Sequence, residues 1–226
     1  MADRVAIVAG AGGPLGRAVT VKLSTAGFSV VGIDRNEEGL RALPDGVRWI
    51  PGDPTDPAAS ALLVQRVAAE IGPPEVLVNA IGAFVVGDAL STTPGDLRLM
   101  MDVNLGAALW LIQAVVPYMR EHGSGSIVHV SARPAAEPTA GLVAYSVSKA
   151  ALSHLVRILD LELRPQGIRV NAVAPQLIDT PKNRTFLPPE ALTHAVTPEA
   201  IADLIAFLAG DAAAPVGGAV VPAYGA

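Results

Sequence analysis

Seven short runs of apolar, largely β-branched residues recur along the chain, and stretches with helical periodicity lie between them. Most of the runs are apolar at every position, which is typical of strands buried on both faces of a parallel sheet. Regular alternation of strands and helices predicts an α/β fold, with a doubly wound sheet of seven parallel strands and helices on both faces. The predicted strands cover residues 4–9, 28–34, 47–50, 75–82, 126–131, 168–175 and 218–224.

The segments between these runs predict five main helices. They end in glycine, which commonly stops a helix, and Thr197 followed by Pro198 is a typical helix start. No linker, repeat or charged tail interrupts the alternation, so we expect a single domain over residues 1–226. The one irregular stretch, near 175–196, is long for a simple connection, and we expect residues 180–196 to form a substrate lid. The predicted helices cover residues 15–27, 56–72, 96–123, 144–167 and 197–210.

The composition argues against several classes of function. A chain of 226 residues that is 51% hydrophobic and 16% charged can bury one sizeable core. Its net charge is −5 and its basic residues are scattered, which argues against a nucleic-acid surface. It has no cysteine, so disulfides and thiolate chemistry are excluded. No apolar run approaches the roughly 18 residues of a membrane span. We therefore expect a soluble, cytoplasmic protein. The histidines lack metal-site spacing, so no metal is expected; they are His122, His129, His154 and His194.

A glycine-rich turn follows the first predicted strand. In AGAGGPLGRAV, Gly10, Gly13 and Gly16 recur every third residue just before a predicted helix. Glycine there permits a tight turn and close backbone approach to a pyrophosphate, which the N–H groups at the helix start can bind. A plain turn would also accept three glycines. Their position after the first strand of an α/β chain favours a dinucleotide site of the Rossmann type.

Asp34 ends the second predicted strand, some twenty residues beyond the glycines. A carboxylate there can accept hydrogen bonds from the adenosine ribose hydroxyls and would repel a 2′-phosphate. It therefore favours NAD(H) over NADP(H). The neighbouring Arg35 keeps NADP(H) possible, because a guanidinium could turn toward a phosphate, and a solvated Asp-Arg turn is the plain structural alternative.

Tyr145 and Lys149 are four residues apart on a predicted helix, so their side chains share one face. A cation within about 4–6 Å stabilises a phenolate, so we expect Lys149 to lower the pKa of Tyr145 from its ordinary value near 10. Tyr145 could then act as a proton donor near neutral pH. An ordinary amphipathic helix is the alternative, but the glycine turn and Asp34 make the catalytic interpretation the better one.

The order and spacing of these motifs resemble the short-chain dehydrogenase/reductase family over nearly the full chain. The likeness rests on GAGGPLG, GDPTD, VNAIG, DVNLGAALWLIQAVVPYM, YSVSK and IRVNAVAPQLIDT. The chain departs from the family pattern at Pro14, which takes the place of the middle glycine, and at Gln176, which replaces the glycine after Pro175. Within the family, GAGGPLG and IDTPKNR are most similar in form to the quinonoid dihydropteridine reductase branch and related short bacterial members.

The resemblance implies an NAD(P)(H)-dependent oxidoreductase that transfers a hydride between nicotinamide and a small carbonyl, alcohol or quinonoid substrate. In this family the tyrosine gives or takes the proton, which corresponds to Tyr145, with support from Lys149 and Asn104. A non-catalytic dinucleotide-binding sensor or assembly subunit is the alternative. The resemblance also implies cofactor contacts beyond Gly10, Gly13, Gly16, Asp34 and Arg35. They are Leu15, Asp53, Pro54, Asn79, Ala80, Gly82, Tyr145, Lys149, Pro175, Ile178 and Thr180.

The serine that binds the substrate oxygen in this family is missing from its usual place, thirteen residues before the tyrosine. That position is Ala132. Ser131 is adjacent, but neighbouring residues of a strand face opposite ways, so only a local bulge could bring it into the site. Arg133 could help to hold the substrate, although a lone surface arginine is more often structural. The absence of the serine is compatible with an enzyme whose substrate is already activated or is held by other groups.

The helices near 103–121 and 145–164 carry apolar residues on more than one face. One stripe can cover the sheet while another meets a symmetry mate, so a homodimer or homotetramer is expected. The residues that suggest this are Leu105, Leu109, Leu152, Leu155 and Leu159.

Overall fold

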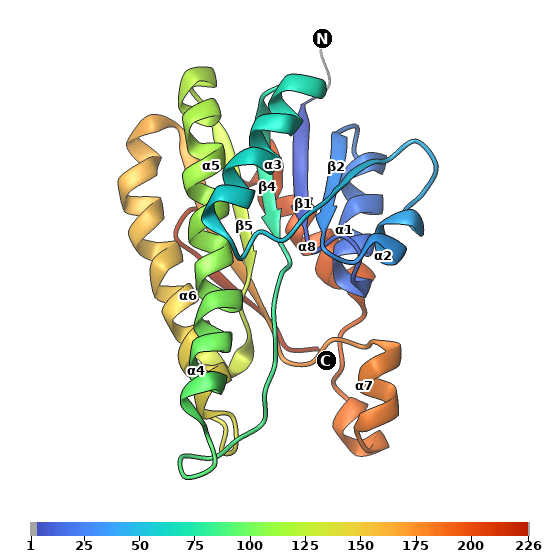
Figure 1. Cartoon of the computed structure of the whole chain (residues 1–226), viewed down its shortest axis with the longest axis vertical. Helices are drawn as coiled ribbons and strands as arrows, with labels where there is room; N and C mark the ends of the chain where they lie inside the picture. The colour runs from blue at the N-terminus through green and yellow to red at the C-terminus, as the bar shows by residue number, and fades with distance from the viewer. Residues whose placement is uncertain (1–3, 226) are drawn as a thin grey trace.

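The computed structural model describes residues 4–225, which form a seven-stranded, fully parallel sheet. The strand order is β3-β2-β1-β4-β5-β6-β7, with helices on both faces (Figure 1), so the predicted doubly wound fold is confirmed. All seven predicted strands are present. They are β1 Val5–Ala9, β2 Ser29–Asp34, β3 Arg48–Pro51, β4 Pro74–Asn79, β5 Gly125–Val130, β6 Ile168–Pro175 and β7 Val220–Ala223.

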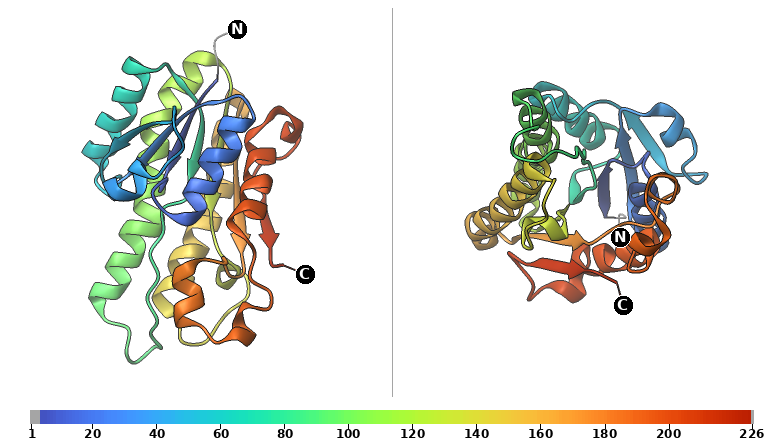
Figure 2. Two further views of the ribbon diagram at one scale, coloured as in Figure 1. Left: turned by 90° about the vertical axis from the view of Figure 1, so that its right-hand side faces the viewer. Right: turned by 90° about the horizontal axis from the view of Figure 1, so that it is seen from below.

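The helices divide between the two faces of the sheet, as the two turned views in Figure 2 show. Helices α3, α5 and α6 cover one face, and α1, α2 and α8 cover the other. Their bounds are α1 Pro14–Thr25, α2 Glu37–Arg41, α3 Pro57–Glu70, α4 Pro94–Met101, α5 Ala107–His122, α6 Val143–Leu163, α7 Pro181–Phe186 and α8 Pro198–Ala209. The short α2 was not predicted. It begins at Asn36, whose side chain accepts a hydrogen bond from the Gly39 N–H.

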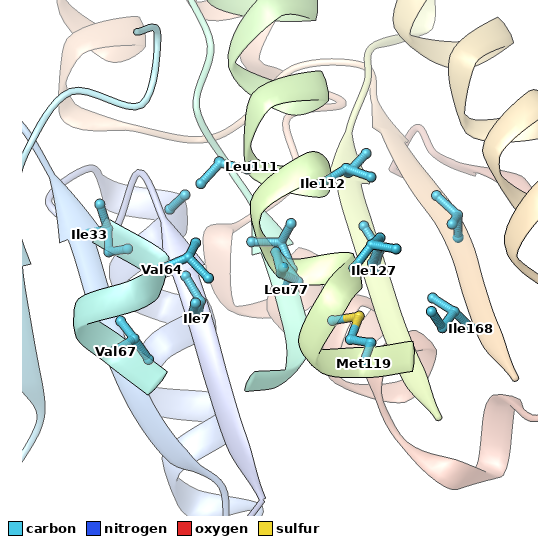
Figure 3. Packing of buried hydrophobic residues seen from close by; sticks show 14 of the residues in the cluster. Ile7, Ile33, Val64, Val67, Leu77, Leu111, Ile112, Met119, Ile127 and Ile168 are labelled. Atoms are coloured by element: carbon cyan, nitrogen blue, oxygen red, sulfur yellow. The ribbon is translucent and has the colours of Figure 1, made fainter. Parts of the chain in front are cut away.

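Two apolar clusters, one on each face, form the core. In the cluster beneath α3, α5 and α6, side chains of these helices meet the inward side chains of the strands (Figure 3). Ile7, Leu77 and Ile127 come from neighbouring strands of this cluster and are fully buried. Because strand residues alternate between the two clusters, nearly every position of a central strand is buried, which explains the continuous apolar runs in the sequence.

The predicted helix 96–123 begins two residues earlier than expected, ends one residue earlier, and is interrupted. It begins at Pro94 behind a capping box formed by Thr93 and Asp96, and a π-helical turn, Asp102–Gly106, separates α4 from α5. Among residues 4–225, Pro94–His122 is the one helix long and apolar enough to cross a membrane by length and composition. Its inward side chains are fully buried against the sheet and α3, which makes it a core helix of this fold; they include Leu111, Val115 and Met119.

None of the leucines that suggested an oligomer is exposed: Leu152 and Leu159 are buried in the core, and Leu105, Leu109 and Leu155 are half-buried. The outer side of α6 exposes other apolar residues, Ile158 and Leu161. An exposed apolar stripe is therefore present on α6, but at residues other than those predicted.

The order in which strands are added to the sheet switches sides between β1 and β4: β2 and β3 lie on one side of β1, and β4 to β7 lie on the other. The strands on either side of this switch end at the same edge, and in sheets of this kind that crevice is where ligands bind. Helices α4 and α7 both extend beyond this edge (Figure 1). The predicted lid, 180–196, contains α7 and a single 3₁₀ turn, Pro189–Leu192, and a bridge between Ile178 and Val196 closes its base.

Candidate active site

The glycine turn brings the end of β1 close to the end of β4. Gly10 has φ +85°, and a Cβ there would lie 2.9 Å from the carbonyl carbon of Ala80. A Cβ on Gly16 would overlap the carbonyl oxygen of Gly10, whereas one on Gly13 would meet nothing closer than 3.5 Å. Packing therefore requires glycine at positions 10 and 16. At position 13 there is room for a side chain, so packing does not require glycine there.

The first turn of α1 presents backbone N–H groups to this crevice. Gly13 occupies the N-cap position, Pro14 follows it, and no side chain caps this end of the helix. Leu15 and Gly16 are buried in the same turn. A helix start without a cap carries unpaired donors and a positive dipole end, which suits an anionic group.

Asp34 is held at the carboxyl end of β2 by two backbone donors. Its Oδ2 accepts a hydrogen bond from Gly12 N at 2.9 Å, and its Oδ1 accepts one from Asn36 N at 2.9 Å. A Cβ on Gly12 would approach the Asp34 carboxylate to 3.1 Å. Gly12 was not among the predicted site residues, although its place in the glycine cluster was a signal.

Arg35 turns toward Asp53 rather than toward Asp34. Its guanidinium lies 3.6 Å from the Asp53 carboxylate, which also accepts two hydrogen bonds from Thr55. Burial alone would raise the pKa of Asp53, but the hydrogen bonds from Thr55 and the charge of Arg35 together lower it. Asp53 is therefore ionised and partly neutralises Arg35.

A pocket of about 240 Å³ lies between the glycine turn and the ends of β2 and β4. Most of its lining was predicted from the sequence, namely Gly10, Gly13, Asp34, Arg35, Asp53, Pro54, Ala80 and Gly82. Its further lining residues were not predicted, namely Thr55, Ile81, Ala83 and Val103. Thr55, Ile81 and Ala83 each follow a predicted residue in the chain, and Val103 directly precedes Asn104, so proximity in sequence was the only signal.

The other predicted cofactor residues lie outside this pocket. Asn79 is buried at the end of β4, where its Oδ1 accepts a hydrogen bond from Ile81 N at 3.1 Å and shapes the turn behind the pocket. Pro175 ends β6, and Ile178 forms the bridge with Val196 at the base of the segment 180–196. Thr180 caps α7 by accepting a hydrogen bond from Asn183 N.

Tyr145 and Lys149 lie in the first turns of α6, as predicted. Lys149 is fully buried, its Nζ donates a hydrogen bond to the carbonyl oxygen of Val130 at 2.8 Å, and burial lowers its pKa to about 8. Burial also raises the pKa of Tyr145 to about 12. The expectation that Lys149 lowers the pKa of Tyr145 is therefore wrong for this structure, because loss of hydration dominates.

Asn104 lies within the π-helical turn, which directs its side chain toward α6 and the strand ends. Its Oδ1 accepts a hydrogen bond from Ala83 N at 2.9 Å, and its Nδ2 donates to Ser148 Oγ at 2.9 Å. Ser148 Oγ donates in turn to the Tyr145 carbonyl oxygen. Ser148 is a residue that the sequence analysis missed, although it lies inside the YSVSK motif.

The segment after β4 joins the pocket to this polar cluster. A Cβ on Gly82 would lie 3.3 Å from Lys149 Nζ and 3.4 Å from Asn104 Oδ1. Two residues further on, the ring of Phe84 packs edge-on against Tyr145 with 4.8 Å between centroids. Residues that line the pocket are therefore continuous with residues that touch Lys149, Asn104 and Tyr145.

The structure also settles which way Ser131 faces. It is buried, and its Oγ lies 2.6 Å from Ser153 Oγ, beneath α6. The backbone at Ala132 is extended, and Ser131 N continues the ladder with Val173 O, so no bulge turns the serine around. The Ser131 hydroxyl thus faces away from the side on which Ala132 lies, which disagrees with its predicted contact to substrate.

Arg133 is engaged in three contacts. Its side chain pairs with Glu137, bonds to Gln176 and lies over the ring of Tyr224. Across residues 4–225, no group of three His, Asp or Glu side chains is arranged to hold a metal ion.

Comparison with known proteins assigns a family to this arrangement. A short chain dehydrogenase family model matches residues 4–191. Cis-4-hydroxycyclohexanecarboxylate dehydrogenase from Sinomonas cyclohexanicum is 34% identical, with 99% of this chain and 96% of that protein covered. Galactitol 2-dehydrogenase from Rhizobium johnstonii is 35% identical, with 96% and 91% covered.

Solved structures agree. A Burkholderia xenovorans protein assigned to the short-chain dehydrogenase/reductases is 29% identical, superposes with a TM-score of 0.88, and is matched over 98% of this chain and 95% of its own. These comparisons do not show the expected resemblance to the quinonoid dihydropteridine reductase branch. Oxidoreductase relatives favour an enzyme over a non-catalytic binding protein. The chain therefore belongs to the short-chain dehydrogenase family and is an oxidoreductase.

Proposed function

We propose that this enzyme uses NAD(H) to interconvert a small carbonyl or quinonoid compound and its alcohol, with Tyr145 as the proton donor and acceptor. One observation carries the proposal. Residues 80–84 form one wall that runs from the glycine-lined pocket to Lys149, Asn104 and Tyr145. A dinucleotide in the pocket and a substrate beside Tyr145 would therefore be neighbours.

The residues of the pocket fit a dinucleotide. The close approaches at Gly10 and Gly16 bring the backbone to the crevice, and the uncapped start of α1 offers donors for a pyrophosphate. The Asp34 carboxylate lies where it can accept hydrogen bonds from ribose hydroxyls and oppose a 2′-phosphate, and the pairing of Arg35 with Asp53 leaves that repulsion in place. A nicotinamide cofactor bound here supplies or accepts the hydride.

The proton is carried by Tyr145. With its pKa raised to about 12, the phenol stays protonated at neutral pH but is a weaker acid, so donation to the oxygen of a carbonyl under reduction depends on stabilisation of the phenolate that Tyr145 leaves. The buried Lys149 ammonium would stabilise the phenolate that remains. Asn104 and Ser148 hold the start of α6, and with it Tyr145, against the segment after β4.

The names of the relatives suggest which alcohols to test first. One relative is named as a dehydrogenase of cis-4-hydroxycyclohexanecarboxylate and another as a dehydrogenase of galactitol. We propose a small secondary alcohol, or the corresponding ketone or quinone, as the substrate class.

The test measures NADH formation or consumption with these alcohols and with a panel of ketones, quinones and quinonoid pterins. Tyr145→Phe should abolish turnover while leaving NADH binding nearly unchanged, because it removes a proton and little contact area. Tyr118→Phe is the matched control, since Tyr118 lies on α5 and packs against the core. Near wild-type turnover in Tyr145→Phe would refute the proposed role.

A further inference from the structure

Two of the departures from the family pattern, Ala132 and Gln176, are linked in the structure through Arg133, which follows Ala132 in the chain and bonds to Gln176. Strands β5 and β6 are adjacent and parallel, so Ala132 and Gln176 both lie at their carboxyl ends. Arg133 follows Ala132, and its Nη1 donates a hydrogen bond to Gln176 Oε1 at 2.7 Å. Ala132, which lacks the hydroxyl, and Gln176, which carries an amide, therefore lie at the ends of adjacent strands.

Arg133 is held by partners on both sides. Its Nε donates to Glu137 Oε2 at 2.7 Å, its Nη2 lies 2.6 Å from the same oxygen, and its guanidinium lies 4.9 Å from the centre of the Tyr224 ring. Its guanidinium is thus held in place by Glu137, Gln176 and Tyr224. Arg133 is a brace for the neighbouring residues rather than a free cation for substrate.

This brace determines which way the Gln176 amide faces. A guanidinium has only donors, so the oxygen of the amide must face Arg133 and the nitrogen must face away from it. The Gln176 backbone is held as well, because its N–H donates to Ala223 O at 3.1 Å. Within residues 4–225 the half-buried Gln176 side chain makes no hydrogen bond through its Nε2. The two Nε2–H donors therefore point away from Arg133 at the carboxyl ends of β5 and β6, and no group among residues 4–225 accepts a hydrogen bond from them.

We propose that Gln176 Nε2 donates a hydrogen bond to the substrate oxygen, in place of the hydroxyl that Ala132 lacks. The proposal rests on the proposed oxidoreductase function. Ser131 is unable to take this role, because its hydroxyl is buried against Ser153. A cation on the amide oxygen polarises the amide and strengthens its N–H donors, so Arg133 would improve Gln176 as a donor.

The substrate class follows from this donor. An oxygen that develops full negative charge needs a second donor besides Tyr145, whereas a quinone spreads the charge over its ring. With Gln176 in place, unactivated secondary alcohols and ketones become substrates despite Ala132.

The experiment compares an unactivated with an activated acceptor in wild type, Gln176→Met and the control Gln65→Met, a glutamine exposed on α3. The probes are cyclohexanone and 4-oxocyclohexanecarboxylate on one side and 9,10-phenanthrenequinone on the other, each with NADH. Gln176→Met should lower kcat with the ketones by about 10²–10³-fold, the usual loss for one oxyanion donor, and lower it far less with the quinone. The Kd for NADH should not change.

Rescue separates a donor from a structural residue. Adding Ala132→Ser to Gln176→Met should restore ketone turnover, because it returns a donor to the strand end, and a purely structural defect would not respond. Arg133→Met should show the same selective loss on ketones and should not add to Gln176→Met. Equal losses on both acceptors, no loss on ketones, or a wild-type enzyme that reduces the quinone but neither ketone would each overturn the role of Gln176. Wild-type protein that turns over no compound of either class would refute the proposed function itself, and this inference with it.

Discussion

The turn at the start of α1 allows a quantitative test with two glycines three residues apart. In Gly16→Ala, the new Cβ would lie 2.6 Å from the carbonyl carbon of Gly10 and 2.8 Å from the Cα of Ala11. These are backbone atoms of the turn and are unable to rotate away. In Gly13→Ala, the nearest atom is 3.5 Å away and the backbone has an ordinary extended conformation. The same added methyl group is therefore sterically blocked at residue 16 and accommodated at residue 13.

The two variants should differ in stability by a measurable amount. Forcing an extra carbon into a packed site typically costs about 1–3 kcal/mol, and Gly16→Ala belongs at the top of that range because the backbone must move. Replacing glycine by alanine within a helix returns at most about 1 kcal/mol. The free energy of unfolding should fall by about 2 kcal/mol, which for a chain of this size lowers Tm by roughly 4–8 °C.

Thermal melts and urea unfolding measure this difference, and NADH fluorescence titrations test the site. Gly16→Ala should melt earlier and bind NADH more weakly, because α1 can no longer approach Gly10. Gly13→Ala should change the free energy of unfolding by less than about 1 kcal/mol. If Gly16→Ala melts within about 1 °C of wild type, or if Gly13→Ala loses as much stability, the packing argument is wrong.

Four further outcomes are expected. Wild type should bind NADH more tightly than NADPH, and Asp34→Ala should shift the ratio of the two Kd values toward NADPH by about tenfold or more, because a charge repulsion of roughly 1–4 kcal/mol is removed; unchanged selectivity would exclude Asp34 as the determinant. Raising the pH from about 8 to 10 should increase the free energy of unfolding by about 2–3 kcal/mol in wild type but not in Lys149→Met. The folded pKa of Lys149 is lowered to about 8, so the unfolded chain binds more protons over that range; parallel pH profiles would contradict this. Hydrogen exchange in residues 180–196 should slow when NADH and a substrate analogue bind, and no protection would indicate a fixed loop. Light scattering should show a homodimer or homotetramer that Leu161→Lys weakens through the exposed apolar stripe of α6, and a wild-type monomer at micromolar concentration would count against it.

The fold and much of the pocket could be predicted because their signals are local. Strands buried on both faces must be apolar throughout, so the runs that become β1 and β4 are visible in the sequence without knowledge of their partners. The glycines of the turn and Asp34 follow strands directly, and parallel strands end at one edge, so their convergence follows from the order of elements alone. The face on which Ser131 lies was likewise predictable from the alternation along an extended strand.

The pKa values and the hydrogen bonds of the site are determined by the tertiary structure. A spacing of four residues brings Tyr145 and Lys149 together, but it does not say that Lys149 is buried and Tyr145 half-buried, and this loss of hydration is what raises the pKa of Tyr145 and lowers that of Lys149. The π-helical turn that directs Asn104 to Ala83 and Ser148 leaves no mark in the apolar periodicity of its helix. A π-helical turn accommodates one residue more than an α-helical turn. Its position in this helix is determined by packing against segments that are distant in sequence, and the sequence pattern does not show which segments those are.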